Sequence, residues 1–387
     1  MAKKTEKNLK RFYAGLALPV MLFLAYVLVS AELLHRAGEY MPMPDIVTHI
    51  EDTGGVYGSA LNATTYWFKK AVYEHYTPDV AALGSSRVLL FRPEAFSVPF
   101  ANLGSMHNLD EVIEMAHAVF PAQPPQVLIL GLDFWWFLPS AETDSISRSA
   151  ERPDMTLRDL FMPPRWLFRG KMRWDDVSRI LYRATPDLGI SGITRKDGFE
   201  SHGSYYYTST YTGRLPAFDR HFDASLARIK NGDKYYEHGS NISQVQIEKL
   251  RKLVRFLKSL DIHVLLFIPP LAPTPAKVLR EQELHTYIKQ LHISLVQLSH
   301  AERAPLFTYH DVLKTGTTDC EFIDSIHGGE TVYYRMLEDM AQRNSLLGSM
   351  VREDVVAENI AAHAGRVSDD PAETDFLDIG CKKDMPL

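Results

Sequence analysis

Residues 79–96 of this chain read DVAALGSSRVLLFRPEAF. A short apolar run, 80–83, ends at Gly84-Ser85-Ser86, and an amphipathic segment follows at once. Glycine tolerates the left-handed backbone of a tight turn, and serine caps the helix that comes next, so the stretch predicts a strand, a sharp turn and a helix. A turn of this kind can also raise a serine side chain as a nucleophile, and the local pattern leaves the two interpretations open.

Four more apolar runs repeat this pattern along the chain. They are FANLGS at 100–105, QVLILGLDFWWF at 126–137, IHVLLFIPP at 262–270 and PLFTYHDVL at 305–313. The helical segments between or after them are 106–120, 243–260, 275–300 and 330–343. Continuous apolar strands that alternate with helices are typical of buried parallel strands. The sequence therefore predicts an α/β fold with a doubly wound, flavodoxin-like parallel sheet, whose ligands bind at the carboxyl ends of the strands.

The composition is that of a protein with a large packed core. The chain has 387 residues, of which 45% are hydrophobic and 11% aromatic. Its formal net charge is -6, and no basic arm or zinc-finger spacing is present in the sequence. This charge balance argues against nucleic acid as a partner.

The N-terminus carries the pattern of a membrane anchor. Five basic residues within 3–11 precede an uncharged apolar stretch, 12–31, which is long enough to cross a hydrocarbon core of about 30 Å as a helix. The positive-inside rule then places the N-terminus in the cytoplasm and the bulk of the chain outside it. A cleavable signal peptide is the alternative, because Val29-Ser30-Ala31 resembles a cleavage site, but the apolar stretch is long for one.

The sequence divides into four parts. We predict a cytoplasmic tip with the transmembrane anchor, a connecting helical region, an α/β domain and an acidic, partly disordered tail, at 1–34, 35–78, 79–347 and 348–387. Residues 138–240 interrupt the strand and helix alternation and form a long insertion. Aromatic residues in and before it either line a groove for sugar or lipid or form the insertion's own small core; they are Trp135, Trp136, Trp166, Trp174 and Tyr205-Tyr206-Tyr207.

The two cysteines, Cys320 and Cys381, leave their state open. They can pair in an oxidising compartment and join the tail to the domain, or each can stand alone. Two thiols without a C-x-x-C spacing do not suggest a structural zinc or iron-sulfur site. We expect no metal and no cofactor.

The last predicted loop supplies partners for a nucleophilic serine. A serine needs a base within hydrogen-bond reach and an acid that orients this base. CEFIDSIHGGE at 320–330 places Asp324 and His327 three residues apart, at the edge of the sheet where Ser86 is expected. The pair His310-Asp311, at the end of a predicted strand, is a rival for the role of base.

The ordered set of these turns resembles the four blocks of the SGNH/GDSL hydrolase superfamily. The set consists of Gly84-Ser85-Ser86, Asn102-Leu103-Gly104, Gly131-Leu132-Asp133 and the Asp-x-x-His of 324–327. The chain is most similar to membrane-anchored extracytoplasmic members such as the teichoic-acid D-alanyl-transfer protein and the alginate O-acetylation proteins. The resemblance covers about 79–137 and 262–340 and implies an SGNH-like α/β domain.

The resemblance implies a role for each matching residue. Ser86 would be the nucleophile, His327 the general base and Asp324 the residue that orients it. The backbone amides of Ser86 and Gly104 would bind the oxyanion.

Three residues beside these are less defined. The third block of the superfamily has an Asn where this chain has Asp133, so Asp133 is turned away, protonated or in a different role. Asn102 either compensates for the missing amide or is a turn residue. Arg87 binds an anionic group of the substrate or covers the sheet edge with its stem.

From these features the sequence predicts a single-pass protein of the cytoplasmic membrane with its main domain outside the cytoplasm. It would transfer or remove an O-acyl group, acetyl in particular, on an envelope or secreted polysaccharide through a serine acyl-enzyme. The resemblance further implies a membrane-bound O-acyltransferase as a partner. The alternatives are a non-catalytic glycan-binding or assembly subunit and a lipid-directed esterase.

Overall fold

The structure, a computed structural model, describes residues 2–383 apart from 62–64, 144–155, 184 and 311–314. Its centre is a sheet of five parallel strands in the order β2-β1-β3-β6-β7. The strands are β1 (Val80–Leu83), β2 (Phe100–Leu103), β3 (Val127–Gly131), β6 (His263–Ile268) and β7 (Leu306–Thr308). All five lie in the apolar runs of the sequence, so the predicted α/β fold is confirmed.

The central strands are buried on both faces. Every residue of β1, β2 and β3 is buried, and in β6 only His263 is not. The register places Ala82 of β1 between Asn102 of β2 and Ile129 of β3. Burial on both faces explains why the runs are continuously apolar rather than alternating.

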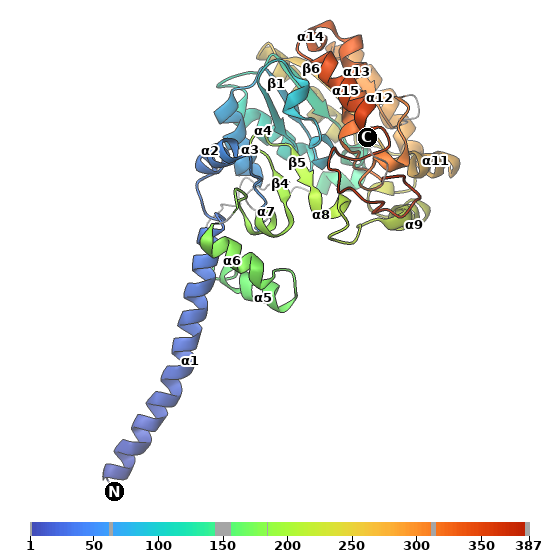
Figure 1. The fold of residues 1–387 in the computed structure, drawn as a ribbon. Helices are drawn as coiled ribbons and strands as arrows, with labels where there is room; N and C mark the ends of the chain where they lie inside the picture. Colours follow the sequence, from blue (N-terminus) through green and yellow to red (C-terminus); the bar gives the residue numbers. More distant parts are fainter. Residues whose placement is uncertain (1, 62–64, 144–155, 184, 311–314, 384–387) are drawn as a thin grey trace.

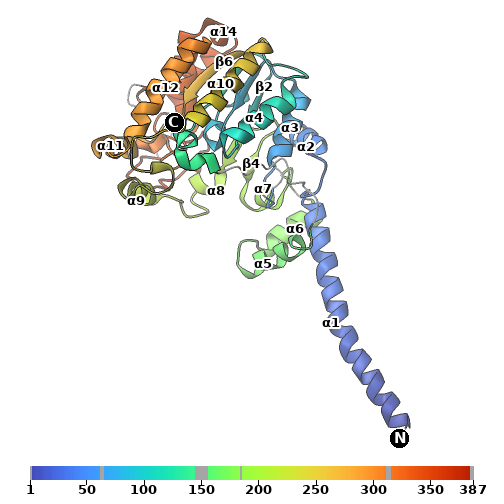
Figure 2. The ribbon, with the colours of Figure 1, turned by 180° about the vertical axis from the view of Figure 1, so that it is seen from behind.

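Helices cover both faces of this sheet. Helices α3 (Thr65–Tyr76), α4 (Leu109–Val119), α10 (Gln244–Ser259) and α12 (Thr286–Glu302) lie on one face, in front in Figure 2. Helices α13 (Glu330–Arg343), α14 (Ser345–Gly348) and α15 (Glu353–His363) lie on the other face, in front in Figure 1. The remaining helices near the sheet are α2 (Met43–Thr53) beside α3 and α11 (Pro273–Glu281) after β6. The sheet is therefore doubly wound, as predicted.

The strand order creates a switch point beside β1. From β1 the chain passes to β2 on one side, and it then returns to β3 on the other side of β1. In sheets of this kind the loops on either side of such a point diverge and leave a crevice at the carboxyl ends of the strands. Gly84-Ser85-Ser86 follows β1 and Asp133 follows β3, so both lie at this point.

The long insertion between β3 and β6 has two parts, which lie in different places in the molecule. One part contains α7 (Ile190–Arg195), the hairpin of β4 (Asp197–Phe199) and β5 (Tyr205–Tyr207), α8 (Thr208–Tyr211) and α9 (Asp223–Asn231). The loop of this hairpin meets the edge strand β2, because the Asn102 N–H donates to the carbonyl of His202 at 2.8 Å. The other part, α5 (Met162–Phe168) and α6 (Trp174–Tyr182), lies apart from the sheet beside α1 (Ala2–Arg36), as Figures 1 and 2 show.

The helix α1 extends away from the α/β domain (Figure 1). Within it, Gly15–Arg36 is long and apolar enough to cross a membrane. Cys320 and Cys381 form a disulfide. An N-terminal apolar helix, whether signal or anchor, together with a disulfide is consistent with an extracytoplasmic location.

Candidate active site

The turn after β1 forms because small residues allow close packing there. A Cβ on Gly84 would lie 2.8 Å from a methyl group of Val88, and one on Gly131 of the neighbouring strand 2.5 Å from the same methyl group. Val88 can therefore cover the ends of both strands only because two glycines stand there. The chain turns into a short 3₁₀ helix, η2 (Ser86–Val88), whose N-terminus is capped by Ser85: its hydroxyl accepts from the Arg87 N–H at 3.0 Å. Ser85 is thus a buried capping residue, while Ser86 beside it is half-buried.

Ser86, His327 and Asp324 form a hydrogen-bonded chain. The Oγ of Ser86 lies 2.8 Å from Nε2 of His327, and Nδ1 of His327 lies 2.7 Å from Oδ2 of Asp324. A carboxylate beside Nδ1 places the ring proton there, and Nε2 is then the acceptor for the Ser86 hydroxyl. The structure brings together the three residues that the sequence predicted, across 241 positions of the chain.

Asp324 is held as a carboxylate. Its Oδ1 accepts hydrogen bonds from the backbone N–H groups of Ile326 at 2.9 Å and His327 at 2.8 Å. Burial raises the pKa of Asp324, but the His327 ring and these two donors lower it further, so that the net pKa lies below its ordinary value. The side chain therefore stays ionised and can stabilise a protonated His327.

The loop that carries His327 is fixed on both sides. A bridge between Phe322 and Gly328 closes its base, and the Ile323 N–H donates to the His327 carbonyl at 2.8 Å. The carbonyl of Ser325 accepts from the Ala272 N–H at 2.9 Å, which joins the loop to the start of α11. Because the backbone is held in this way, the His327 ring needs little ordering before it acts.

Arg87 joins the loops around this site. Its side chain is 0% exposed; Nη1 donates to Oδ1 of Asp133 at 3.0 Å, Nε to the carbonyl of Ile326 at 3.0 Å and Nη2 to the carbonyl of Pro269 at 2.9 Å. The guanidinium also lies over the Trp135 ring, 5.2 Å from its centroid. Arg87 therefore uses these donors within the fold and ties the loops after β3 and β6 and the His327 loop to η2.

Asp133 is turned toward Arg87. Burial raises the pKa of its carboxyl, and the Arg87 guanidinium opposes this rise only in part, so that the net pKa lies above its ordinary value. The carboxylate thus serves as the buried counter-ion of Arg87. At the position where the resemblance implies an Asn, the structure thus has a buried Asp that pairs with Arg87.

Asn102 and Gly104 use their donors within the fold. The Asn102 side-chain amide donates to the carbonyls of Val88 at 2.8 Å and Phe91 at 3.3 Å, and its Oδ1 accepts from the Gly104 N–H at 2.9 Å. Asn102 is 0% exposed. The structure therefore does not direct either group toward Ser86, and Asn102 joins the end of β2 to the segment 88–91 at the end of η2.

The cavity at Ser86 reveals a residue that the sequence reasoning missed. It has a volume of about 280 Å³, and Ser86, Ser105, Tyr57, Tyr205 and Tyr207 contribute to its lining. Ser105 has a φ of 88°, which is unusual for a residue with a side chain. No acceptor among the described residues binds the backbone N–H of Ser86 or of Ser105. The motif assigned the oxyanion role to Gly104, and the residue that lines the cavity is the next one in the chain, Ser105.

The aromatic residues of the insertion are divided between the two places described above. Tyr205 and Tyr207 line the Ser86 cavity, and the Tyr207 ring centroid lies 6.1 Å from that of His327. Trp166 packs against the buried cluster that includes Leu33 and Leu34 of α1, whereas Trp174 is 76% exposed. Of the residues for which the sequence left a groove and a core open, Tyr205 and Tyr207 thus line a cavity, Trp166 packs in a core cluster, and Trp174 does neither.

A second, larger cavity lies away from the Ser86 relay. It has a volume of about 620 Å³ between α11, α12 and the ends of β6 and β7, and neither Ser86, His327 nor Asp324 lines it. His310 lines this cavity, and burial lowers its pKa to about 3. His310 therefore makes no contact with Ser86, and Asp311, its proposed partner, lies outside the described residues.

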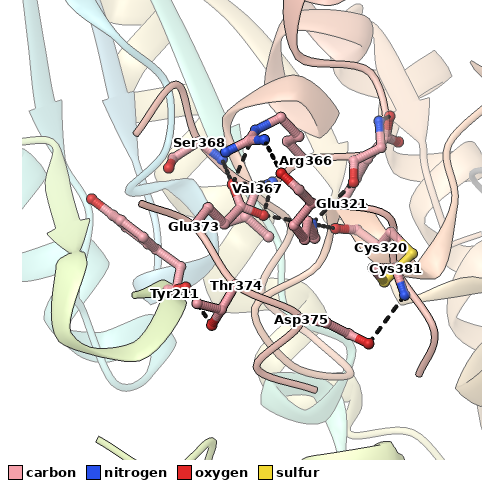
Figure 3. Close-up of polar contacts among 12 residues, drawn as sticks. Tyr211, Cys320, Glu321, Arg366, Val367, Ser368, Glu373, Thr374, Asp375 and Cys381 are labelled. Carbon is pink, nitrogen blue, oxygen red and sulfur yellow. Dashed lines mark hydrogen bonds and ion pairs between the residues drawn. A yellow bond between two sulfur atoms is a disulfide. The ribbon is translucent and has the colours of Figure 1, made fainter. Parts of the chain in front are cut away.

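The C-terminal segment packs against the segment that carries the His327 loop. The sequence predicted a loose tail for this part of the chain. Residues 353–363 form α15, and the segment up to 383 is packed around buried Glu373 (Figure 3). Glu373 accepts from the N–H groups of Val367 at 2.9 Å and Ser368 at 3.0 Å, and Val367 in turn accepts from the Glu330 N–H at 2.7 Å. Composition indicated disorder because acidic and small residues are abundant, but these few buried polar contacts and the disulfide order the segment. Residues 384–387 lie outside the described part.

Removing the disulfide is expected to lower stability substantially. Cys320 and Cys381 close a loop across 61 positions, and Cys320 lies four residues before Asp324. The double variant Cys320→Ser, Cys381→Ser should lose roughly 2–4 kcal/mol of unfolding free energy, because its unfolded chain is less restricted. Thermal unfolding of the full chain with and without reductant measures this. An unfolding midpoint that reductant leaves unchanged would contradict the expectation.

We compared the chain with models of protein families, with curated proteins and with solved structures, and none of the three comparisons found a match. The geometry of the site therefore carries the functional argument that follows.

Proposed function

We propose that this protein is a serine-dependent acyl-transfer enzyme, an esterase or O-acyltransferase of SGNH-like type. The observation that carries the proposal is the relay from Ser86 through His327 to Asp324, with heavy-atom distances of 2.8 and 2.7 Å. Both are within the reach required for proton transfer between a nucleophile, a base and its orienting acid. The relay ends at a half-buried serine that opens into a cavity, so a substrate can reach it.

The chemistry follows from the order of these groups. Ser86 Oγ attacks the ester carbonyl while its proton passes to Nε2 of His327, and Asp324 stabilises the imidazolium that forms. Ser86 and Ser105 both line the cavity, and their backbone N–H groups, which have no acceptor among the described residues, would be the donors for the oxyanion. The protonated His327 then gives its proton to the leaving alcohol, and the acyl group stays on Ser86. In the second half, water or a sugar hydroxyl gives its proton to His327 and takes the acyl group.

The surroundings favour a short acyl group and a carbohydrate acceptor. A cavity of about 280 Å³ has room for a small acyl group together with part of a sugar ring, and tyrosine rings on its wall suit the flat faces of sugars. We therefore propose acetyl transfer on an envelope or secreted polysaccharide. This assigns the site to the extracytoplasmic side, with α1 as an uncleaved anchor in the cytoplasmic membrane.

Tethering supports transfer rather than free hydrolysis. A transferase whose acyl donor is exported through the membrane gains from staying beside that source, whereas a secreted esterase does not. A membrane-bound O-acyltransferase is the partner that this arrangement would require.

One observation favours a second candidate, a non-catalytic glycan-binding or assembly subunit. The Asn102 side-chain amide and the Gly104 N–H both donate hydrogen bonds within the fold. Binding of the oxyanion would therefore depend on two backbone N–H groups and no side-chain amide. The two candidates differ in whether Ser86 reacts. A lipid-directed esterase is less favoured, because the larger apolar cavity does not contain the relay.

Covalent labelling separates the two candidates. The full chain in detergent is incubated with a fluorophosphonate probe, which phosphonylates a reactive serine with loss of fluoride, and the modified peptide is identified by mass spectrometry. We expect the label on Ser86, with none on the Ser86→Ala variant or on heat-unfolded protein. Folded protein that leaves Ser86 unlabelled would favour the binding subunit.

A further inference from the structure

Residues 156–183, which contain α5 and α6 and are called the α5–α6 hairpin below, pack on the outer end of α1. Leu160, Val177 and Ile180 of the hairpin form one buried cluster with Leu33 and Leu34 of α1. The contact is also polar, since Nη1 of Arg36 donates to the carbonyl of Leu181 at 2.8 Å. Figures 1 and 2 both show the hairpin against α1 and outside the α/β domain.

The hairpin reaches down into the part of α1 that would lie in the membrane. The ring of Phe161 lies 5.6 Å from that of Tyr26, and Val27 also packs against the buried cluster. Tyr26 is ten residues before Arg36, the end of the candidate span Gly15–Arg36. The uncharged part of α1 ends at Ala31, five residues or about 7.5 Å beyond Tyr26, so if α1 crosses the bilayer, this side of the hairpin lies at the depth of the outer headgroups and upper acyl chains.

The exposed surface of the hairpin has the composition of a membrane interface. Large apolar side chains are exposed on it: Leu157 (78%), Phe161 (48%), Phe168 (93%), Trp174 (76%) and Tyr182 (80%). The hairpin also has seven basic and three acidic residues, in a chain whose net charge is -6. Soluble surfaces rarely gather so many large apolar side chains, whereas aromatic rings among arginines are typical of helices that lie in the headgroup region.

A buried carboxylate fixes the α/β domain relative to α1. Glu39, three residues after the end of α1, is 0% exposed; its Oε1 accepts from the Ile190 N–H at 2.7 Å and from the Ala60 N–H at 3.0 Å. The end of α1 is thus joined both to the hairpin and to α7. The part of the insertion that holds the β4–β5 hairpin and α7 lies on the side of the domain nearest the α5–α6 hairpin (Figures 1 and 2).

We propose that the α5–α6 hairpin docks on the outer leaflet of the membrane that α1 crosses. Phe168, Trp174 and Tyr182 lie among the lipid headgroups and upper acyl chains, and the arginines around them bind anionic phosphates. The hairpin and α1 together hold the Ser86 cavity at a fixed height and tilt above the bilayer. This inference rests on the anchor in the proposed function and does not depend on the reactivity of Ser86.

The test places a fluorescent probe at three depths of the full chain. Both native cysteines are in the disulfide, so a new cysteine is the reactive thiol among the described residues. Phe168→Cys reports on the hairpin, Leu22→Cys on the middle of α1 and Leu346→Cys, an exposed apolar site on α14, on the far end of the domain. Each is labelled with an environment-sensitive dye and reconstituted into phosphatidylcholine vesicles with one quarter phosphatidylglycerol, with and without nitroxide-labelled lipid.

We expect nitroxide lipid to quench the probes at Phe168 and Leu22 by roughly twofold or more, and the probe at Leu346 hardly at all. Quenching at Leu22 without quenching at Phe168 would overturn the docking inference and leave the anchor intact. Lack of quenching at Leu22 would overturn both. If the Phe168 probe is shielded from the nitroxide lipid only in samples that retain other membrane proteins, the surface would be assigned to a protein partner instead. Fluorophosphonate labelling of the same samples reports separately on Ser86.

Discussion

Replacing His327 with alanine will lower the rate of Ser86 acylation by roughly 10⁴-fold or more, without loss of the fold. Among the described residues the Ser86 hydroxyl contacts one base, Nε2 of His327 at 2.8 Å, so in this part of the chain the variant leaves no base to accept its proton. His327 is half-buried in a loop that is fixed through its backbone, and its truncation therefore leaves the packing around it in place. The measurement is the initial rate of p-nitrophenyl acetate hydrolysis by the full chain in detergent.

Two further variants make this prediction specific. Asp324→Asn should reduce the same rate by roughly 10³- to 10⁴-fold, because an amide beside Nδ1 no longer stabilises the imidazolium. His300→Ala, an exposed histidine near the end of α12, should leave the rate unchanged. If His327→Ala kept more than about a tenth of the rate, the proposed base would be wrong.

The second large effect is expected from Arg87. Replacing it with methionine leaves the Asp133 carboxylate buried without its counter-ion and removes donors from the carbonyls of Ile326 and Pro269. We expect a loss of roughly 3–5 kcal/mol in unfolding free energy, since an unpaired buried charge costs far more than a surface ion pair. Denaturant unfolding followed by tryptophan fluorescence measures this loss. The Arg87→Met, Asp133→Leu double variant should recover part of it, because no charge is then left unpaired.

Asp133→Asn distinguishes the structural role of Asp133 from a role in oxyanion binding. If Asp133 merely pairs with Arg87, the amide keeps the shape and one hydrogen bond, and the variant should lose stability by roughly 1–3 kcal/mol with no gain in activity. A rise in the rate of p-nitrophenyl acetate hydrolysis would contradict the structure, because it would mean that the new amide reaches the oxyanion.

Local sequence patterns predicted the sheet and the relay. The apolar runs around β1, β2, β3, β6 and β7 are long enough and sufficiently free of polar residues to identify buried parallel strands. Parallel strands share one carboxyl edge, so a motif at the end of β1 and another in the last loop were bound to meet there. The sequence thus predicted the contact of Ser86 with His327, whereas the catalytic role of these residues stays a prediction.

The partners of single polar groups were not predictable in this way. Arg87 and Asp133 are separated by 46 positions, and the oxyanion role expected of Gly104 was lost to the side chain of Asn102, two residues away. Nothing in hydrophobic periodicity tells which of several nearby acceptors a buried donor will reach, because that choice depends on side-chain packing after the chain has folded.

The C-terminal segment and the α5–α6 hairpin show the same difference between what local sequence predicts and what tertiary contacts decide. Composition indicated disorder after 348, yet Glu373 and the Cys320–Cys381 disulfide order the tail against the His327 loop. The sequence of the insertion showed only that aromatic and basic residues were abundant, and the tertiary structure packs this part of the chain against α1. The sequence by itself determined which segments form the strands, which segment forms the apolar helix and which three residues form the relay. Periodicity and short motifs are local properties and can therefore be read without the fold. The tertiary structure decided which buried charges pair, which donors of the described residues remain free and which part of the insertion packs on α1, because each of these depends on contacts between residues far apart in the chain.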